Sequence, residues 1–252
     1  MTWGNLLVAA DDSPAGLHAV RVAEALAGAA NVRLSVLTVL TSTAAPLPSR
    51  LVRYQPLVAY GVPGIEIVRV ADELRAGLLV LGRTWQGASR DPRLGPTADA
   101  VARRSRIPCL YIPLPQKQFS HLVVAIDGTE RGLAVLEGAR DFLAVAGRDL
   151  EVVTVEPRTA GYEDDGPYTE TPRSLRVAEA LRDAAARNGD AYPFQMLHGE
   201  PASLVRTRLL APESDLLVVG ARRGGPGGPP SSTGVGRTLL YTAPCAVLTV
   251  PL

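Results

Sequence analysis

Residues 6–13 read Leu-Leu-Val-Ala-Ala-Asp-Asp-Ser, and residues 122–129 read Leu-Val-Val-Ala-Ile-Asp-Gly-Thr. Each stretch is an apolar run that ends in an aspartate, followed by a Ser or Thr of the kind that caps a helix. Helices are predicted over 14–29 and over 130–146, where Gly147 is the expected stop. The chain therefore contains the opening strand, turn and helix of a β-α-β unit twice.

The two copies continue to match further along the chain. Short apolar, β-branched runs that follow the two helices predict a second strand in each copy, at Leu34–Leu40 and Leu150–Val155. Later partners are Gly61-Val62-Pro63 with Gly199-Glu200-Pro201, residues 77–82 with 215–220, and residues 107–113 with 243–251. Matching over most of the length indicates an internal repeat and not an isolated motif.

The second copy is longer between its second and third strands, within residues 157–190. Residues 172–188 read as an additional helix, with Leu175, Ala178, Leu181 and Ala185 expected on one face. The first copy has only residues 41–55 at that place, and prolines there argue against a full helix. We therefore expect the first copy to have reduced or lost this helix.

Strands with continuous apolar runs that alternate with helices predict a parallel sheet covered on both faces. In such sheets ligands bind beyond the carboxyl ends of the strands, where the strand order reverses. The residues at those ends are Asp11 and Asp127 after the first strands, Val39 and Val155 after the second, and Gly82 and Gly220 after the fourth. Gly-, Arg- and Ser-containing loops then run into helices predicted near 96–105 and 234–242, and such loops can cradle an anion.

Composition excludes several classes of protein. The 252 residues include 26 basic and 25 acidic side chains, so no strongly basic nucleic-acid binder is indicated. Lys117 is the only lysine, which excludes a Walker-type phosphate loop. Cys109 and Cys245 are too few for a disulfide framework or a zinc site, and we expect both to be buried core residues in a cytoplasmic protein. No apolar run is long enough for a membrane helix, and the N-terminus has no signal-peptide pattern.

With these motifs in view, the chain resembles the universal stress protein family in its tandem form. The resemblance rests on residues 124–129, the Gly-x-Pro helix starts, residues 216–220 and residues 243–251. It implies two flavodoxin-like (adenine nucleotide alpha hydrolase-like) α/β repeats, 1–115 and 119–252, each with a five-stranded parallel sheet. It also implies that the final strands, near 109–113 and 245–250, pair within the chain as a pseudo-twofold internal dimer.

Members of this family that bind ATP carry Gly, two residues, Gly, nine residues and then Gly-Ser or Gly-Thr after the fourth strand. In the second copy this pattern falls on Gly220, Arg223 with Gly224 one residue later, and Thr233-Gly234, or in a shifted frame on Gly224, Gly234 and Val235. In the first copy it falls on Gly82, Trp85, Gly95 and Pro96. Trp85 would fill space that a phosphate needs, and Pro96 has no N–H to donate, although Thr97 still offers a hydroxyl.

The resemblance thus implies ATP or another adenine nucleotide as a regulatory ligand in stress response, favoured in the second copy. The residues that would line the two sites are Ala9, Asp11, Val39, Gly82, Gly95 and Thr97 in the first copy, and Ala125, Asp127, Val155, Gly220, Arg223, Gly224, Thr233, Gly234 and Val235 in the second. Asp11 and Asp127 would lie near a Mg²⁺ carried by the nucleotide.

Other interpretations remain open at this point. Asp11 and Asp127 can simply hold the turns that start the helices. Decayed phosphate loops in both copies would leave a nucleotide-free scaffold that binds a protein partner. A slow ATPase or nucleotide hydrolase is a third alternative, although no residue is evidently placed to activate water. The sequence names no protein partner and leaves a further homodimer open.

Overall fold

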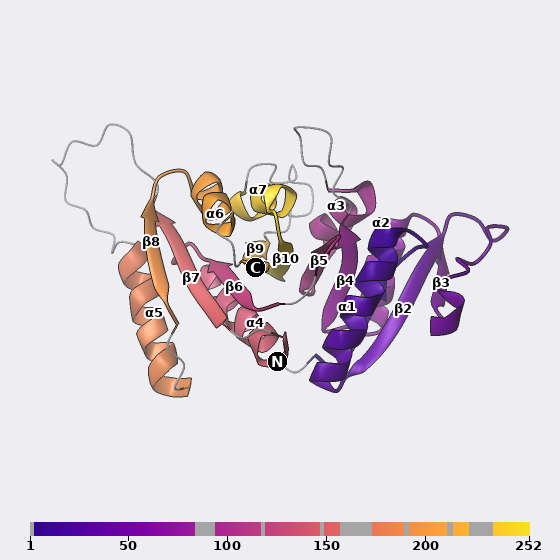
Figure 1. Ribbon diagram of the computed structural model, residues 1–252, viewed down its shortest axis with the longest axis horizontal. Helices are drawn as coiled ribbons and strands as arrows, with labels where there is room; N and C mark the ends of the chain where they lie inside the picture. The colour runs from indigo at the N-terminus through magenta and orange to yellow at the C-terminus, as the bar shows by residue number, and fades with distance from the viewer. Residues whose placement is uncertain are drawn as a thin grey trace.

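The computed structural model describes residues 3–83, 94–116, 119–146, 149–156, 173–188, 192–210, 214–221 and 234–252 (Figure 1). The first repeat contains β1 (Asn5–Ala9), α1 (Pro14–Ala30), β2 (Arg33–Leu40), the 3-10 turn η1 (Val52–Tyr54), β3 (Leu57–Tyr60), α2 (Pro63–Glu73), β4 (Leu78–Arg83), α3 (Pro96–Arg104) and β5 (Cys109–Pro113). The second contains β6 (His121–Ala125), α4 (Glu130–Ala146), β7 (Asp149–Glu156), α5 (Arg173–Asn188), β8 (Phe194–His198), α6 (Pro201–Leu209), β9 (Leu216–Ala221), α7 (Val235–Thr242) and β10 (Ala246–Pro251).

The strands form one ten-stranded sheet in the order β3-β2-β1-β4-β5-β10-β9-β6-β7-β8, which runs from right to left in Figure 1. Within each repeat neighbouring strands are parallel. The repeats join where β5 and β10 pair antiparallel, with Leu110 opposite Leu248. The predicted fold of two five-stranded parallel repeats, paired through their last strands, is therefore confirmed.

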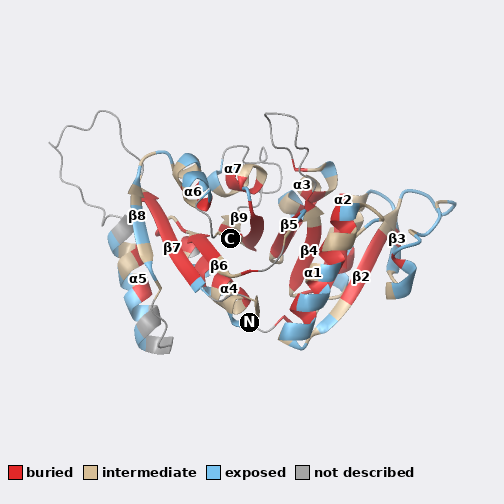
Figure 2. Cartoon of the chain, in the orientation of Figure 1, coloured by how far each residue is buried: buried red, intermediate tan, exposed pale blue. Residues whose placement is uncertain are grey.

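Helices cover both faces of the sheet, as the continuous apolar strands predict. Helices α1, α4 and α5 pack on one face, and α2, α3, α6 and α7 pack on the other. Alternate residues of each strand serve the two layers, so that Leu6 and Val8 face one core while Leu7 and Ala9 face the other. Figure 2 shows the inner strands as the most buried elements, with exposed residues on the edge strands β3 and β8 and on the outer sides of the helices.

Local sequence explains where several helices begin. Ser13 caps α1, because its hydroxyl accepts a hydrogen bond from the Gly16 N–H at 3.0 Å. Thr129 does the same for α4, accepting from the Gly132 N–H at 3.0 Å. Helices α2, α3 and α6 each begin with a proline in the first turn, where a missing N–H costs nothing.

Helix α5 was predicted to carry Leu175, Ala178, Leu181 and Ala185 on one face, and of these Leu181 lies in the core while Leu175 is half exposed. The contact with the sheet is made by Val177 and Leu181. These two residues are four apart and share a face, because a helix turns once in 3.6 residues. Between β2 and β3 of the first repeat the structure has only the turn η1, where the second repeat has α5.

No helix in the described ranges combines the length and the apolar character needed to cross a membrane.

Candidate functional site

The strand order places a switch point in each repeat, between β1 and β4 and between β6 and β9. Chain connections run in opposite directions from the two sides of such a point, which leaves a crevice beyond the carboxyl ends of the two strands. The residues singled out from the sequence lie at these ends. Ala9 and Ala125 end the first strand of each repeat, and Gly82 and Gly220 lie near the end of the fourth.

A cavity of about 620 Å³ lies at the switch point of the second repeat. This volume is in the range of small-molecule sites, which is roughly 300–1,000 Å³. Six of the residues predicted for the second site line it: Ala125, Asp127, Val155, Gly220, Gly234 and Val235. The structure thus brings together residues from β6, β7, β9 and α7 that are up to 110 positions apart in the sequence.

The start of helix α7 forms one side of this cavity. Gly234 is its N-cap residue, with ordinary φ and ψ angles of −74° and 137°, and a Cβ atom added there would meet no atom within 4 Å. Gly236 packs against the end of β9 so closely that a Cβ atom would lie 2.3 Å from the carbonyl oxygen of Gly220. The first-turn N–H groups of Val235 and Gly236 have no helix carbonyl to bind, so this end of α7 can face an anion.

Asp127 holds the turn between β6 and α4. Its Oδ1 accepts hydrogen bonds from the N–H and the hydroxyl of Thr129, at 3.1 and 2.6 Å. A Cβ atom on Gly132 would lie 2.4 Å from that oxygen, so the start of α4 sits directly against the carboxylate. Asp11 accepts from the Ser13 N–H at 3.1 Å in the same way. Both aspartates thus hold the turn that precedes the following helix.

The first repeat places its predicted residues at equivalent positions, but none of them lines the cavity described above. They are Ala9, Asp11, Val39, Gly82, Gly95 and Thr97. A Cβ atom on Gly82 would lie 2.6 Å from the backbone oxygen of Ala15, so the first turn of α1 packs against the end of β4. The equivalent neighbour of Gly220 is the side chain of Leu252, at 2.5 Å. Backbone meets the strand end in one repeat, and a flexible side chain meets it in the other.

Four further residues named from the sequence, Arg223, Gly224, Thr233 and Trp85, lie outside the described residues.

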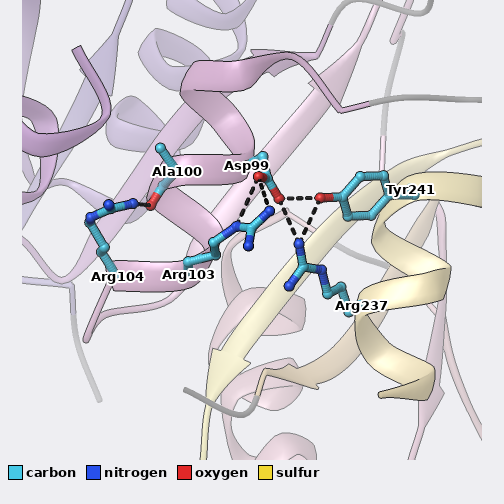
Figure 3. A network of polar contacts seen from close by, with 6 residues as sticks. All are labelled: Asp99, Ala100, Arg103, Arg104, Arg237 and Tyr241. Atoms are coloured by element: carbon cyan, nitrogen blue, oxygen red, sulfur yellow. Dashed lines mark hydrogen bonds and ion pairs between the residues drawn. The ribbon is translucent and has the colours of Figure 1, made fainter. Parts of the chain in front are cut away.

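Sequence reasoning missed a polar network that joins the two repeats at the edge of the cavity (Figure 3). Asp99 of α3 accepts at Oδ2 from Arg103 of the same helix, with Nε at 2.9 Å. At Oδ1 it accepts from Arg237 of α7 at 3.1 Å and from the hydroxyl of Tyr241. The only local signal was the spacing of four residues between Asp99 and Arg103, which is common on exposed helices.

The network changes the acidity of its members. Burial is the largest single effect on Asp99 and raises its pKa, but hydrogen bonds from Arg103 and Tyr241 and the two guanidinium charges outweigh it. The pKa of Asp99 is therefore lowered. The pKa of Tyr241 is raised, first by burial and then by its hydrogen bond to the carboxylate. Asp99 is thus ionised at neutral pH while Tyr241 keeps its proton.

Arg83, at the end of β4, is a buried cation that the sequence did not single out. Its guanidinium donates hydrogen bonds to the carbonyl oxygens of Leu240, Ala243 and Cys245, at 2.9, 2.7 and 2.9 Å. Burial lowers its pKa from the ordinary value. Because these carbonyls lie at and just after the C-terminal end of α7, Arg83 fixes that helix to the first repeat.

The described residues give little support for a metal site or for a reactive thiol. No group of three or more His, Cys, Asp and Glu side chains in these ranges could hold a metal ion. Cys109 and Cys245 are buried, as expected, and burial raises the pKa of each thiol to about 12.

Comparison with known proteins gives a consistent result. The model of the universal stress protein family matches residues 49–113 and 118–251. Among solved structures, a universal stress protein from Archaeoglobus fulgidus DSM 4304 aligns at 17% identity over 100% of this chain and 99% of its own, with a TM-score of 0.72. A Pseudomonas aeruginosa UCBPP-PA14 protein assigned to the same group aligns at 18% identity over 99% and 93%, with a TM-score of 0.73. No curated protein sequence matches significantly.

Proposed function

The chain belongs to the universal stress protein family, and we propose that its second repeat binds an adenine nucleotide as a regulatory ligand in a cytoplasmic stress response. The observation that carries this proposal is the cavity at the second switch point, which is lined by six of the residues predicted for that repeat. The first repeat closes α1 onto the corresponding strand end, so we assign binding to the second repeat alone.

The lining suits the parts of a nucleotide. Val153 and Val155 of β7, with Val205 of α6, offer an apolar wall to a base. The start of α7 offers backbone N–H groups and glycines to phosphate, where side chains would keep the phosphate at a distance. A nucleotide would thus place its base beside β7 and its phosphates beside α7.

Mg²⁺ would supply charge neutralisation of the phosphates when bound. The described residues offer it little besides Asp127, whose Oδ1 already accepts two hydrogen bonds from Thr129. A magnesium ion would therefore be held chiefly by phosphate oxygens. Neither Asp127 nor Asp11 is proposed as a metal site without nucleotide.

The first test is to denature freshly purified protein and identify any released small molecule by mass spectrometry, together with thermal-shift measurements with Mg-ATP. We expect about one adenine nucleotide per chain or, for protein purified empty, a clear rise in melting temperature. If no nucleotide is released and Mg-ATP does not raise the melting temperature, the proposal is wrong and a nucleotide-free scaffold is favoured.

A matched pair of variants locates the site. Gly234→Glu places a negative side chain at the mouth of the cavity, and open space around Gly234 lets the protein fold. Gly95→Glu makes the same change at the N-cap of α3 in the first repeat. Loss of the ATP-induced shift in Gly234→Glu alone supports the assignment, and loss in Gly95→Glu alone contradicts it.

A further inference from the structure

One wall of the second repeat's cavity belongs to the first repeat. Every strand residue in the lining comes from β6, β7, β9 or β10, yet helix α3 adds Asp99, Ala102, Arg103 and Arg104. Pairing of β5 with β10 brings the repeats together, and α3 and α7 lie on the same face of the joined sheet. The site is therefore composed across the boundary between repeats.

This wall carries an excess of positive charge. Arg103 and Arg104 line it together with Asp99, and Arg237 of α7 lines the adjoining part of the cavity. The side chain of Arg103 is exposed, at 38%, whereas that of Arg237, at 24%, is partly shielded from water. A charge-assisted hydrogen bond to an anion is stronger in such a place than on an open surface.

Asp99 sets where the two guanidinium groups lie. Its two oxygens are divided between them, Oδ2 with Arg103 and Oδ1 with Arg237 (Figure 3). Each guanidinium presents several N–H groups, so binding to one carboxylate leaves donors for a second anion. Arg83 holds the far end of α7 to the first repeat, which keeps Arg237 in register with α3.

The charged wall lies at the opposite end of the cavity from the apolar one. In the sheet, β7 is separated from β10 by β6 and β9, and β10 is the strand that adjoins the first repeat. Val153 and Val155 of β7 thus mark the distal end, while α3 and α7 mark the end at the repeat boundary. A ligand with a base beside β7 would direct its phosphate chain toward the arginines.

We propose that Arg103 of the first repeat and Arg237 of the second together bind the distal phosphates of the nucleotide. The site then selects adenosine di- and triphosphates over the monophosphate and the nucleoside. This inference rests on the proposed function, because it assigns the phosphate end of the same ligand. It adds that the first repeat, which carries the more damaged phosphate loop, supplies a specificity-determining residue to its neighbour.

The test measures affinities for adenosine, AMP, ADP and ATP by titration calorimetry on the full chain. Arg103→Gln and Arg237→Gln are each expected to weaken ATP about tenfold, ADP less, and AMP and adenosine within about twofold. Arg103→Lys and Arg237→Lys keep the charge and are expected to recover part of the loss. The matched control is Arg206→Gln, on an exposed residue of α6 that does not line the cavity, and it should bind like the wild type.

The possible outcomes distinguish the phosphate-binding role of the arginines from the proposed nucleotide binding on which it rests. Wild-type protein that binds no adenine nucleotide would overturn both. Wild-type protein that binds ATP, with variants that weaken all four ligands equally or none of them, would overturn only the assignment of the arginines. A loss that grows with the number of phosphates is the result that a general disturbance of folding would not produce.

Discussion

Arg83 shows how much one side chain can contribute to the joining of the two repeats. Its three carbonyl partners lie 157 to 162 residues away in the sequence, and all of them belong to the second repeat. Buried carbonyls without a donor are costly, so the bonds of Arg83 act on both repeats at once.

Replacing Arg83 with methionine keeps an elongated side chain but removes the donors. We expect Arg83→Met to lower the free energy of unfolding by about 2–4 kcal/mol, because three buried carbonyls lose their partner. Urea denaturation measures it, with Arg206→Met on the exposed side of α6 as the control. A loss below about 0.5 kcal/mol would show that water replaces the guanidinium.

The two buried thiols give a second prediction at this scale. With pKa values of about 12, Cys109 and Cys245 carry almost no thiolate near neutral pH and should resist iodoacetamide until the chain is unfolded in urea. Above pH 9.0, the ordinary pKa of a thiol, both thiols ionise in the unfolded chain but stay protonated in the folded chain. The free energy of unfolding is therefore expected to fall as the pH rises from about 9 toward 12. Mass spectrometry of the native protein tests it, and rapid native labelling would contradict it.

At the scale of elements, close approaches of backbone decide how helices meet the ends of strands. Helix α7 reaches β9 through Gly236, and α1 reaches β4 through Gly82. Neither approach leaves room for a side chain. The cavity therefore depends on how closely α7 approaches the sheet as much as on which residues line it.

Gly236→Ala tests this dependence. The new Cβ atom would lie 2.3 Å from the Gly220 oxygen, so α7 must shift away from β9. We expect a loss of about 1–3 kcal/mol in stability and weaker binding of ATP. Gly234→Ala, two residues earlier in open space, is the control and should change stability by less than about 0.5 kcal/mol. Equal behaviour of the two variants would argue against tight packing of α7.

At the scale of the whole molecule, contacts between repeats make one continuous structure. The sheet crosses the boundary through β5 and β10, the Asp99 network joins α3 to α7, and Trp3 packs on Phe142 with ring centres 5.6 Å apart. These contacts lie on both faces of the sheet and at its centre. We therefore expect the repeats to unfold together.

Acid should loosen the boundary through Asp99. Its pKa is lowered in the folded chain, so its contribution to stability is complete above the unfolded value, near 3.8, and is lost as pH falls through the lower folded value. Wild-type protein should thus lose more stability than Asp99→Asn as pH falls below about 4. Melting temperatures between pH 3 and 6 measure the difference, and parallel curves for the two proteins would contradict it.

Local patterns in the sequence were enough to predict the internal repeat, the order of strands and helices and the parallel α/β class. Apolar runs, helix caps such as Ser13 and Thr129, and prolines at helix starts act within a few residues, so their effects can be recognised locally. The same reasoning placed Leu181 of α5 correctly but grouped it with Leu175, whereas Val177 packs beside it, because periodicity alone does not say which side meets the sheet.

The position of the described cavity at the second switch point, and the residues of the first repeat that reach it, depend on tertiary packing. Gly82 and Gly220 occupy equivalent places in the sequence, yet one meets the backbone of Ala15 and the other the side chain of Leu252. Arg237 meets Asp99 only because β5 and β10 pair. Such contacts join residues far apart in the chain, and their geometry follows from packing of the whole sheet, which no local pattern encodes.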